Sequence, residues 1–151
     1  MRYWLMKSEP EAYGIDDLAR DKVTAWWGVR NYQARNFMRD QMKLGDRGFF
    51  YHSNCAEPGI VGIVEVCKLA YPDPTQFERK HKYFDPKSTP ENPRWLNVDV
   101  RLVKKTPLVG LAELRRYKAL AHMRVLAKGN RLSITPVDPA EWKFINERLI
   151  K

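Results

Sequence analysis

The segment "RWLNVDVRLVKK", residues 94–105, alternates apolar and polar side chains over most of its length. The apolar residues fall on one side of an extended chain: Leu96, Val98, Val100 and Leu102. The residues between them fall on the other side: Trp95, Asn97, Asp99 and Arg101. A period of two is typical of a strand with one face against a core. The segment therefore predicts a half-buried strand.

Further strands are expected on both sides of this segment. "RGFFYHS" (47–53) and "GIVGIVEVCKLAY" (59–71) are apolar runs joined by a short connection, which favours a strand pair. "RYWLMK" (2–7) and "RLSITPV" (131–137) add two more. Between 72 and 93 the chain carries five prolines and is expected to be a long surface connection.

Helices are expected between and after these strands. Residues 31–42 place four apolar side chains on one stripe at helical spacing: Ala34, Phe37, Met38 and Met42. Brief helices are expected at 14–21, 108–117 and 120–126. The last begins at Asp138, because Pro139 and Glu141 complete a capping box.

The order of these elements indicates the fold class. About five strands have unequal connections and no regular alternation with helices. This pattern favours an α+β fold with a small, mostly antiparallel, barrel-like sheet and flanking helices over a doubly wound sheet. A chain of 151 residues fits a single domain spanning 1–151.

The charge points to a polyanionic partner. The formal net charge is +9, and the excess lies in residues 29–53, at +3, and 93–137, at +8. Nucleic acid is the commonest partner of such a surface, although these segments could also be ordinary solvated faces. No apolar run approaches the roughly 20 residues of a membrane span. We therefore expect no membrane contact and a cytoplasmic protein, nuclear in a eukaryote.

Several kinds of chemistry find no template. His52, Cys55, Cys67 and His81 lack the paired spacing of a zinc site, so we expect no metal, and both cysteines are interpreted as reduced thiols. No glycine-rich phosphate loop or GxSxG motif occurs, and no cofactor is implied. Lys7 and Glu9 could act as an acid/base pair, or lie in a surface turn.

The stretch "TAWWGVRNYQARNFMRD", residues 24–40, combines flat rings with guanidinium and amide groups. An extruded base needs an apolar wall to stack on and donors for its edge, and this mixture supplies both. Any one of the tryptophans is more often a core residue, because its burial removes a large apolar area from water.

Seven motifs carry a resemblance to a known family: "YWLMKSEP" (3–10), "WWGVRNYQARNFMRDQMKLGD" (26–46), "FYHSN" (50–54), "GIVGIVEV" (59–66), "AYPDPTQF" (70–77), "PRWLNVDVR" (93–101) and "RLSITPV" (131–137). Over roughly residues 2–149 the chain resembles the EVE domain family. The resemblance implies a PUA-like fold, a strongly bent barrel related to the YTH and ASCH domains. It also implies a reader of modified bases in DNA, with modified cytosines the leading candidates.

The resemblance implies a ligand pocket lined by eleven positions: Lys7, Ser8, Trp26, Arg30, Asn31, Tyr32, Arg35, His52, Ser53, Arg131 and Ser133. One departure is that Trp27 replaces the acidic residue that the family often has before the "GVRN" glycine, which bears on base preference.

We expect a non-enzymatic module that binds a modified base in DNA or RNA. Trp26 would be the stacking wall, while Asn31, Ser53 and Ser133 would read the base edge. The three arginines would hold the sugar-phosphate or orient other groups: Arg30, Arg35 and Arg131. Basic residues of 94–131 would follow the backbone. The alternatives are an ASCH-like amidohydrolase acting on a modified nucleoside through Lys7 and Glu9, and an interaction scaffold without a nucleic-acid ligand.

Overall fold

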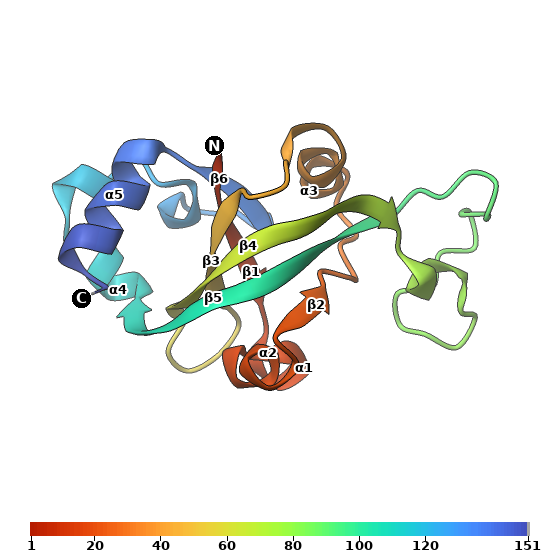
Figure 1. Cartoon of the computed structure of the whole chain (residues 1–151), viewed down its shortest axis with the longest axis horizontal. Helices are drawn as coiled ribbons and strands as arrows, with labels where there is room; N and C mark the ends of the chain where they lie inside the picture. Colours follow the sequence, from red (N-terminus) through yellow and green to blue (C-terminus); the bar gives the residue numbers. More distant parts are fainter. Residues whose placement is uncertain (151) are drawn as a thin grey trace.

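The computed structural model describes residues 1–150. Its strands are β1 (Tyr3–Ser8), β2 (Val23–Ala25), β3 (Arg47–His52), β4 (Gly59–Pro72), β5 (Leu96–Gly110) and β6 (Ile134–Val137). Its α-helices are α1 (Pro10–Tyr13), α2 (Ile15–Asp21), α3 (Tyr32–Asn36), α4 (Leu111–Leu114) and α5 (Pro139–Arg148) (Figure 1). A π-helical turn covers Phe37–Gln41, and 3₁₀ turns cover Pro74–Phe77, Lys118–Leu120 and Arg124–Leu126.

The six strands form one strongly bent, barrel-like sheet in the order β2-β5-β4-β3-β1-β6. The end strands β2 and β6 are not paired with each other, so the barrel is open. Neighbouring strands are antiparallel, except that β1 runs parallel to β3. Long β4 and β5 pair along most of their length with several bulges, which bend the sheet. The expected PUA-like fold is confirmed.

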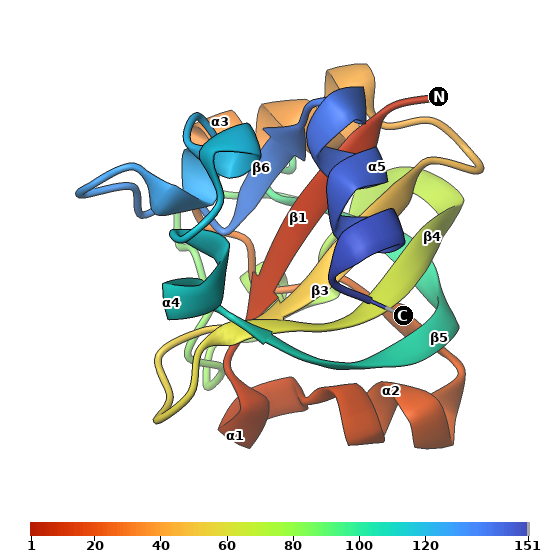
Figure 2. The ribbon, with the colours of Figure 1, turned by 90° about the vertical axis from the view of Figure 1, so that its left-hand side faces the viewer.

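Both faces of the sheet are buried. Alternate residues of β1 point to opposite sides: Trp4 and Met6 join one apolar cluster, and Leu5 joins the other. The first cluster packs against α2, α3 and the π-helical turn, and the second packs against α5. In Figure 2, α5 and the α1–α2 segment lie on opposite sides of β1 and β3.

The expected strand at 94–105 exists, but it is longer and more buried. It continues to Gly110, because Val109 and Gly110 pair with β4. Trp95 and Asn97, expected on the polar side, are 6% and 1% exposed. Trp95 is buried because the proline-rich connection folds over it. The Gln76 amide donates to the carbonyl of Trp95 and accepts from its backbone N–H, and Asp85 accepts from its indole N–H at 2.7 Å.

The helical expectations are partly correct. The expected helix at 31–42 begins at Tyr32 and widens into the π-helical turn after Asn36, and its apolar stripe is buried as predicted. The helix expected at 108–117 is only the four residues of α4, because the residues before it belong to β5. Residues 120–126 form 3₁₀ turns instead of a helix. The capping box of α5 is confirmed.

Candidate functional site

A cleft of about 350 Å³ opens beside the C-terminal ends of β1 and β2. Five separate segments form its walls: the end of β1 with α1, the stretch from β2 to α3, the residue after β3, the proline-rich connection and the segment before β6. Backbone bonds hold three of them together, since Ser53 N donates to Ser8 O at 3.0 Å and Lys7 N donates to Ser133 O at 2.8 Å. The volume is at the lower end of the roughly 300–1,000 Å³ usual for small-ligand sites.

The cleft has a buried floor and an exposed rim. Trp26 and Val29 are buried. The half-buried polar groups above them are Lys7, Ser8, Ser53 and Ser133. The exposed residues of the rim are Glu9, Ala12, Trp27, Asn31, Lys82 and Arg131. A flat group bound in the cleft would therefore rest on an apolar surface at the floor, and polar side chains would surround the edge of that group.

Eight of the eleven expected positions line the cleft: Lys7, Ser8, Trp26, Arg30, Asn31, Ser53, Arg131 and Ser133. The other three lie outside its lining: Tyr32, Arg35 and His52. Tyr32 stacks on Trp95 with ring centroids 4.7 Å apart, and the Arg35 guanidinium lies 4.7 Å from the Tyr32 centroid. These two residues form the outer surface of α3, beside the cleft rather than in it.

His52 stabilises the helix next to the cleft. Its Nε2 accepts from the backbone N–H of Ile15 at 3.1 Å, at the start of α2. The bond needs an unprotonated nitrogen, and burial lowers the pKa of His52. His52 therefore has a structural partner already. Within residues 1–150 no group of three or more histidine, cysteine or carboxylate side chains is arranged to hold a metal ion.

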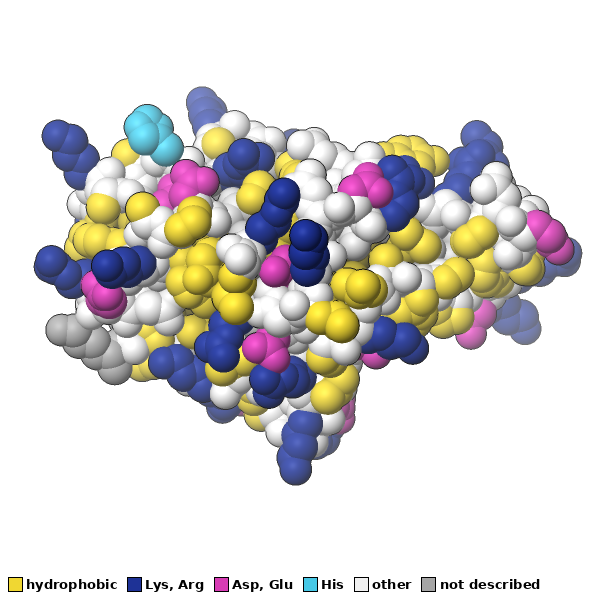
Figure 3. Space-filling model, turned by 45° about the horizontal axis from the view of Figure 1, so that its top comes forward, with side chains coloured by type: hydrophobic (Ala, Val, Ile, Leu, Met, Phe, Trp, Pro, Cys, Tyr) yellow, Lys and Arg dark blue, Asp and Glu magenta, His cyan; other side chains and the backbone are white. Residues whose placement is uncertain are grey.

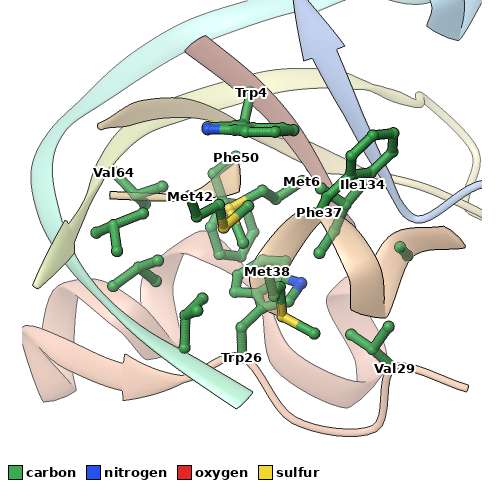
Figure 4. Packing of buried hydrophobic residues seen from close by; sticks show 14 of the residues in the cluster. Trp4, Met6, Trp26, Val29, Phe37, Met38, Met42, Phe50, Val64 and Ile134 are labelled. Atoms are coloured by element: carbon green, nitrogen blue, oxygen red, sulfur yellow. The ribbon is translucent and has the colours of Figure 1, made fainter. Parts of the chain in front are cut away.

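Trp26 is mainly a core residue. It is 7% exposed, and its ring meets Phe50 edge-on with centroids 5.4 Å apart. Figure 4 shows it among the other buried side chains of the first cluster. Only its remaining exposed edge reaches the cleft. Trp26 therefore supports the fold as well as lining the cleft, and its role as a stacking wall stays a prediction.

Arg30 is fully engaged within the protein. Its Nε and Nη2 donate to the carbonyl of Tyr83 at 3.0 and 2.8 Å, and Nη2 also donates to Thr75. Its Nη1 donates to the carbonyl of Val29 and to Asp73 Oδ2 at 3.1 Å. A guanidinium has five N–H donors, so none remains for a phosphate. Of the two roles expected for Arg30, only the orientation of other cleft groups fits this geometry.

Asp73 is the centre of this brace and was missed in the sequence. Its buried carboxylate accepts from Arg30, from Gly28 N at 2.8 Å, and from Thr75 N and Oγ1 at 2.8 and 2.6 Å. Burial alone would raise the pKa of Asp73, but the hydrogen bonds from Thr75, Gly28 and Arg30 outweigh it, so this pKa is lowered. The brace fixes the proline-rich connection against the segment after β2.

Several polar groups of the cleft remain free for a ligand. Asn31 Oδ1 caps α3 by accepting from Ala34 N at 3.0 Å, which leaves its Nδ2. Ser8 Oγ donates to Tyr13 O at 2.6 Å. Among the described residues, the side chains of Lys7, Ser53, Arg131 and Ser133 line the cleft without a hydrogen bond or ion pair to another residue. Burial lowers the pKa of Lys7, because desolvation disfavours its charged form.

The basic segment 94–131 contributes only Arg131 to the cleft lining. Lys105 pairs with Asp16 of α2, and Arg101 pairs with Glu65 of β4. Figure 3 shows lysine and arginine side chains spread over the face in view, with acidic groups between them. Two basic residues of the segment are thus paired with acidic neighbours, and its expected role along a nucleic-acid backbone stays a prediction.

Trp27, Lys82 and Tyr83 line the cleft, although they were not among the expected site residues. Lys82 and Tyr83 belong to the connection interpreted as a surface loop. Gly28 allows this loop to pack closely against the segment after β2, because a Cβ at position 28 would lie 2.7 Å from the Tyr83 ring. Its φ of +80° also favours glycine. The only sequence signal was a cluster of basic and aromatic residues at 80–83.

Comparisons with known proteins find relatives over nearly the whole chain. A family model described as the EVE domain matches residues 2–148. Thymocyte nuclear protein 1 of Homo sapiens is 46% identical over 163 residues, which cover 95% of this chain and 72% of that protein. A crystal structure of a protein from Pseudomonas syringae has a TM-score of 0.92 at 46% identity, covering 96% of this chain and 97% of that chain.

One solved relative carries a ligand. The crystal structure of human THYN1 protein in complex with 5-methylcytosine-containing DNA has a TM-score of 0.89 at 45% identity, covering 97% of this chain and 96% of that chain. An ASCH protein from Zymomonas mobilis has a TM-score of 0.54 at 11% identity, which is a likeness of fold alone. No helix within residues 1–150 has the length and apolar character needed to span a membrane.

Proposed function

Since this chain belongs to the EVE domain family, we propose that it is a non-enzymatic module that holds a modified nucleobase, a modified cytosine in DNA, in the cleft beside β1 and β2. The observation that carries the proposal is the complex of human THYN1 protein with 5-methylcytosine-containing DNA, at 45% identity over nearly the whole of both chains. This chain has a cleft of suitable size and lining, formed within the matched residues.

The free groups of the cleft suggest how a base would be held. The extruded base would lie on the exposed edge of Trp26, with the hydroxyls of Ser53 and Ser133 and the Nδ2 of Asn31 at its polar edge. Arg131 and Lys82, both exposed at the rim, would contact phosphates. Arg30 would act indirectly, by fixing the walls.

The geometry favours binding over catalysis. The acid/base pair of the ASCH-like alternative would be Lys7 and Glu9, but no ion pair joins them among the described residues. Glu9 is exposed, and its carboxylate accepts instead from Asn54 Nδ2 at 3.4 Å. An exposed carboxylate lacks the burial that usually tunes a general acid or base.

A binding screen tests the proposal. Labelled DNA duplexes that differ at one position, carrying cytosine, 5-methylcytosine, adenine or N6-methyladenine, are titrated with the protein at two salt concentrations. We expect the tightest binding with 5-methylcytosine and a preference that persists at the higher salt, because base contacts depend less on salt than phosphate contacts do. Equal affinity for all four duplexes would refute the proposal. Turnover of a free modified nucleoside would favour the amidohydrolase instead.

A further inference from the structure

Two adjacent tryptophans of the cleft differ sharply in exposure. Trp26 is 7% exposed and lies in the core, whereas Trp27 is 40% exposed at the rim. Burying a tryptophan ring removes a large apolar area from water, and Trp27 gives up much of that gain. The other large apolar residues of comparable exposure, such as Leu108, do not line the cleft. Trp27 is therefore a large apolar surface at the entrance of the site.

The Trp27 ring is held in place from behind. It meets the rings of His81 and Tyr83 edge-on, with centroids 5.9 and 5.6 Å away. His81 and Tyr83 in turn belong to the connection that Arg30 and Asp73 fix against this segment. A ring that is already ordered loses little conformational entropy when it makes a new contact. The position and orientation of Trp27 are thus set before any ligand arrives.

Cations accompany Trp27 at the rim. Lys82 is exposed, and its Nζ lies 4.9 Å from the Tyr83 ring centroid. Arg131 reaches the rim from the segment before β6, on a different part of the chain. Two cations on separate elements can hold the phosphates of a strand that passes across the entrance. Trp27 lines the same cleft as these two cations, so a strand held by them would bring the nucleotides next to an extruded base close to its ring.

Extrusion of a base from a duplex leaves a gap between its neighbours, and the lost stacking opposes binding. Proteins that kink duplexes offset such a loss by inserting an apolar side chain between base steps. We propose that the Trp27 ring enters the gap left by the extruded base, so that the ligand of this protein is double-stranded DNA. The inference rests on the proposed function, because the gap exists only if a base occupies the cleft.

The test compares one modified base in two contexts. Fluorescence anisotropy measures the affinity of wild-type protein, Trp27→Leu and Trp27→Phe for a paired duplex with one 5-methylcytosine and for the same strand alone. Trp27→Leu should lower affinity for the duplex by roughly tenfold or more, because the loss of stacking on one base corresponds to about that factor. Affinity for the single strand should fall by less than about threefold, because an unpaired strand leaves no gap for the ring to fill. Trp27→Phe, which keeps a ring, should retain most of the duplex affinity.

Each other result contradicts the inference. Equal losses in the two contexts would mean that Trp27 supports the pocket and not the gap, and no loss in either would mean that it does not contact DNA. Leu108→Ala is the matched control, because Leu108 is 41% exposed and lies outside the cleft lining, and it should change neither affinity. A wild-type protein that binds cytosine and 5-methylcytosine duplexes equally would overturn the proposed function itself, whatever the Trp27 variants do.

Discussion

Replacing Asp73 with alanine removes the carboxylate that joins the proline-rich connection to the cleft. The side chain of Asp73 is 0% exposed, and that of its partner Arg30 is 19% exposed. The change leaves a mostly buried guanidinium without its counter-ion and the N–H of Gly28 without an acceptor. Removing one partner of a buried ion pair costs about 3–5 kcal/mol.

The loss should be visible as a lower melting temperature. For a chain of this length, 1 kcal/mol corresponds to about 2–4 °C, so Asp73→Ala should melt roughly 6–20 °C below the wild type. Calorimetry measures the shift, and brief trypsin digestion followed by mass spectrometry measures opening of the connection. Cleavage after Lys80 and Lys82 should become faster than in the wild type, because the brace no longer holds this segment.

A matched control separates the buried pair from an ordinary one. Asp40 pairs with Arg39 at 2.8 Å, but both side chains are about half exposed, at 51% and 49%. Asp40→Ala should therefore cost less than about 1 kcal/mol. If Asp73→Ala melted within the error of Asp40→Ala and trypsin cut both at the same rate, the connection would not depend on Asp73, and the account of the brace would be refuted.

Three further outcomes follow from the described contacts. Trp26→Ala should destabilise the protein by about 3–5 kcal/mol in urea unfolding, since its ring packs in the core; a loss of affinity with unchanged unfolding would contradict this. Because burial lowers the pKa of His52 in the folded protein, the unfolded chain takes up this proton first as the pH falls. The melting temperature should therefore fall as pH drops below about 6.5, and it should fall less in His52→Gln. Parallel curves of melting temperature against pH for wild type and variant would show that His52 is not the cause. Arg131→Ala should weaken binding to modified and unmodified duplexes alike and flatten the slope of log affinity against log salt by about one unit. Lys105→Ala should have neither effect, because Lys105 lies outside the cleft lining. Equal effects of the two variants would mean that the DNA-contacting surface extends well beyond the cleft.

Periodic patterns in the sequence predicted most of the elements. Alternation identified β5, and helical spacing of apolar residues identified the stripe that α3 and its π-helical turn bury. The three-residue strand β2, Val23–Ala25, was missed, because three residues are too few to show a period. It forms through pairing with β5, which depends on residues far along the chain.

The candidate site was harder to predict for a physical reason. The types of residue that line it were recognisable, but their partners come from distant segments. The sequence around Arg30 does not show whether its N–H donors are free for a phosphate. In the structure all of them are satisfied within the protein, by Val29, Asp73, Thr75 and Tyr83. For the same reason the sequence did not indicate that Lys82 and Tyr83 would reach the cleft.

The position of β1 in the sheet affects how the protein folds during synthesis. Of the six strands of this sheet β1 is made first and β6 last, yet β1 lies between β3 and β6. The wall formed by Lys7 and Ser133 therefore closes only after Ser133 has been translated. Such long-range pairing slows folding. Until β6 is made, the apolar side chains of Trp4, Leu5 and Met6 can make non-native contacts. We expect the cleft to be among the last parts of the nascent protein to form, so a ribosome-bound chain that ends before residue 133 should have no base-binding site.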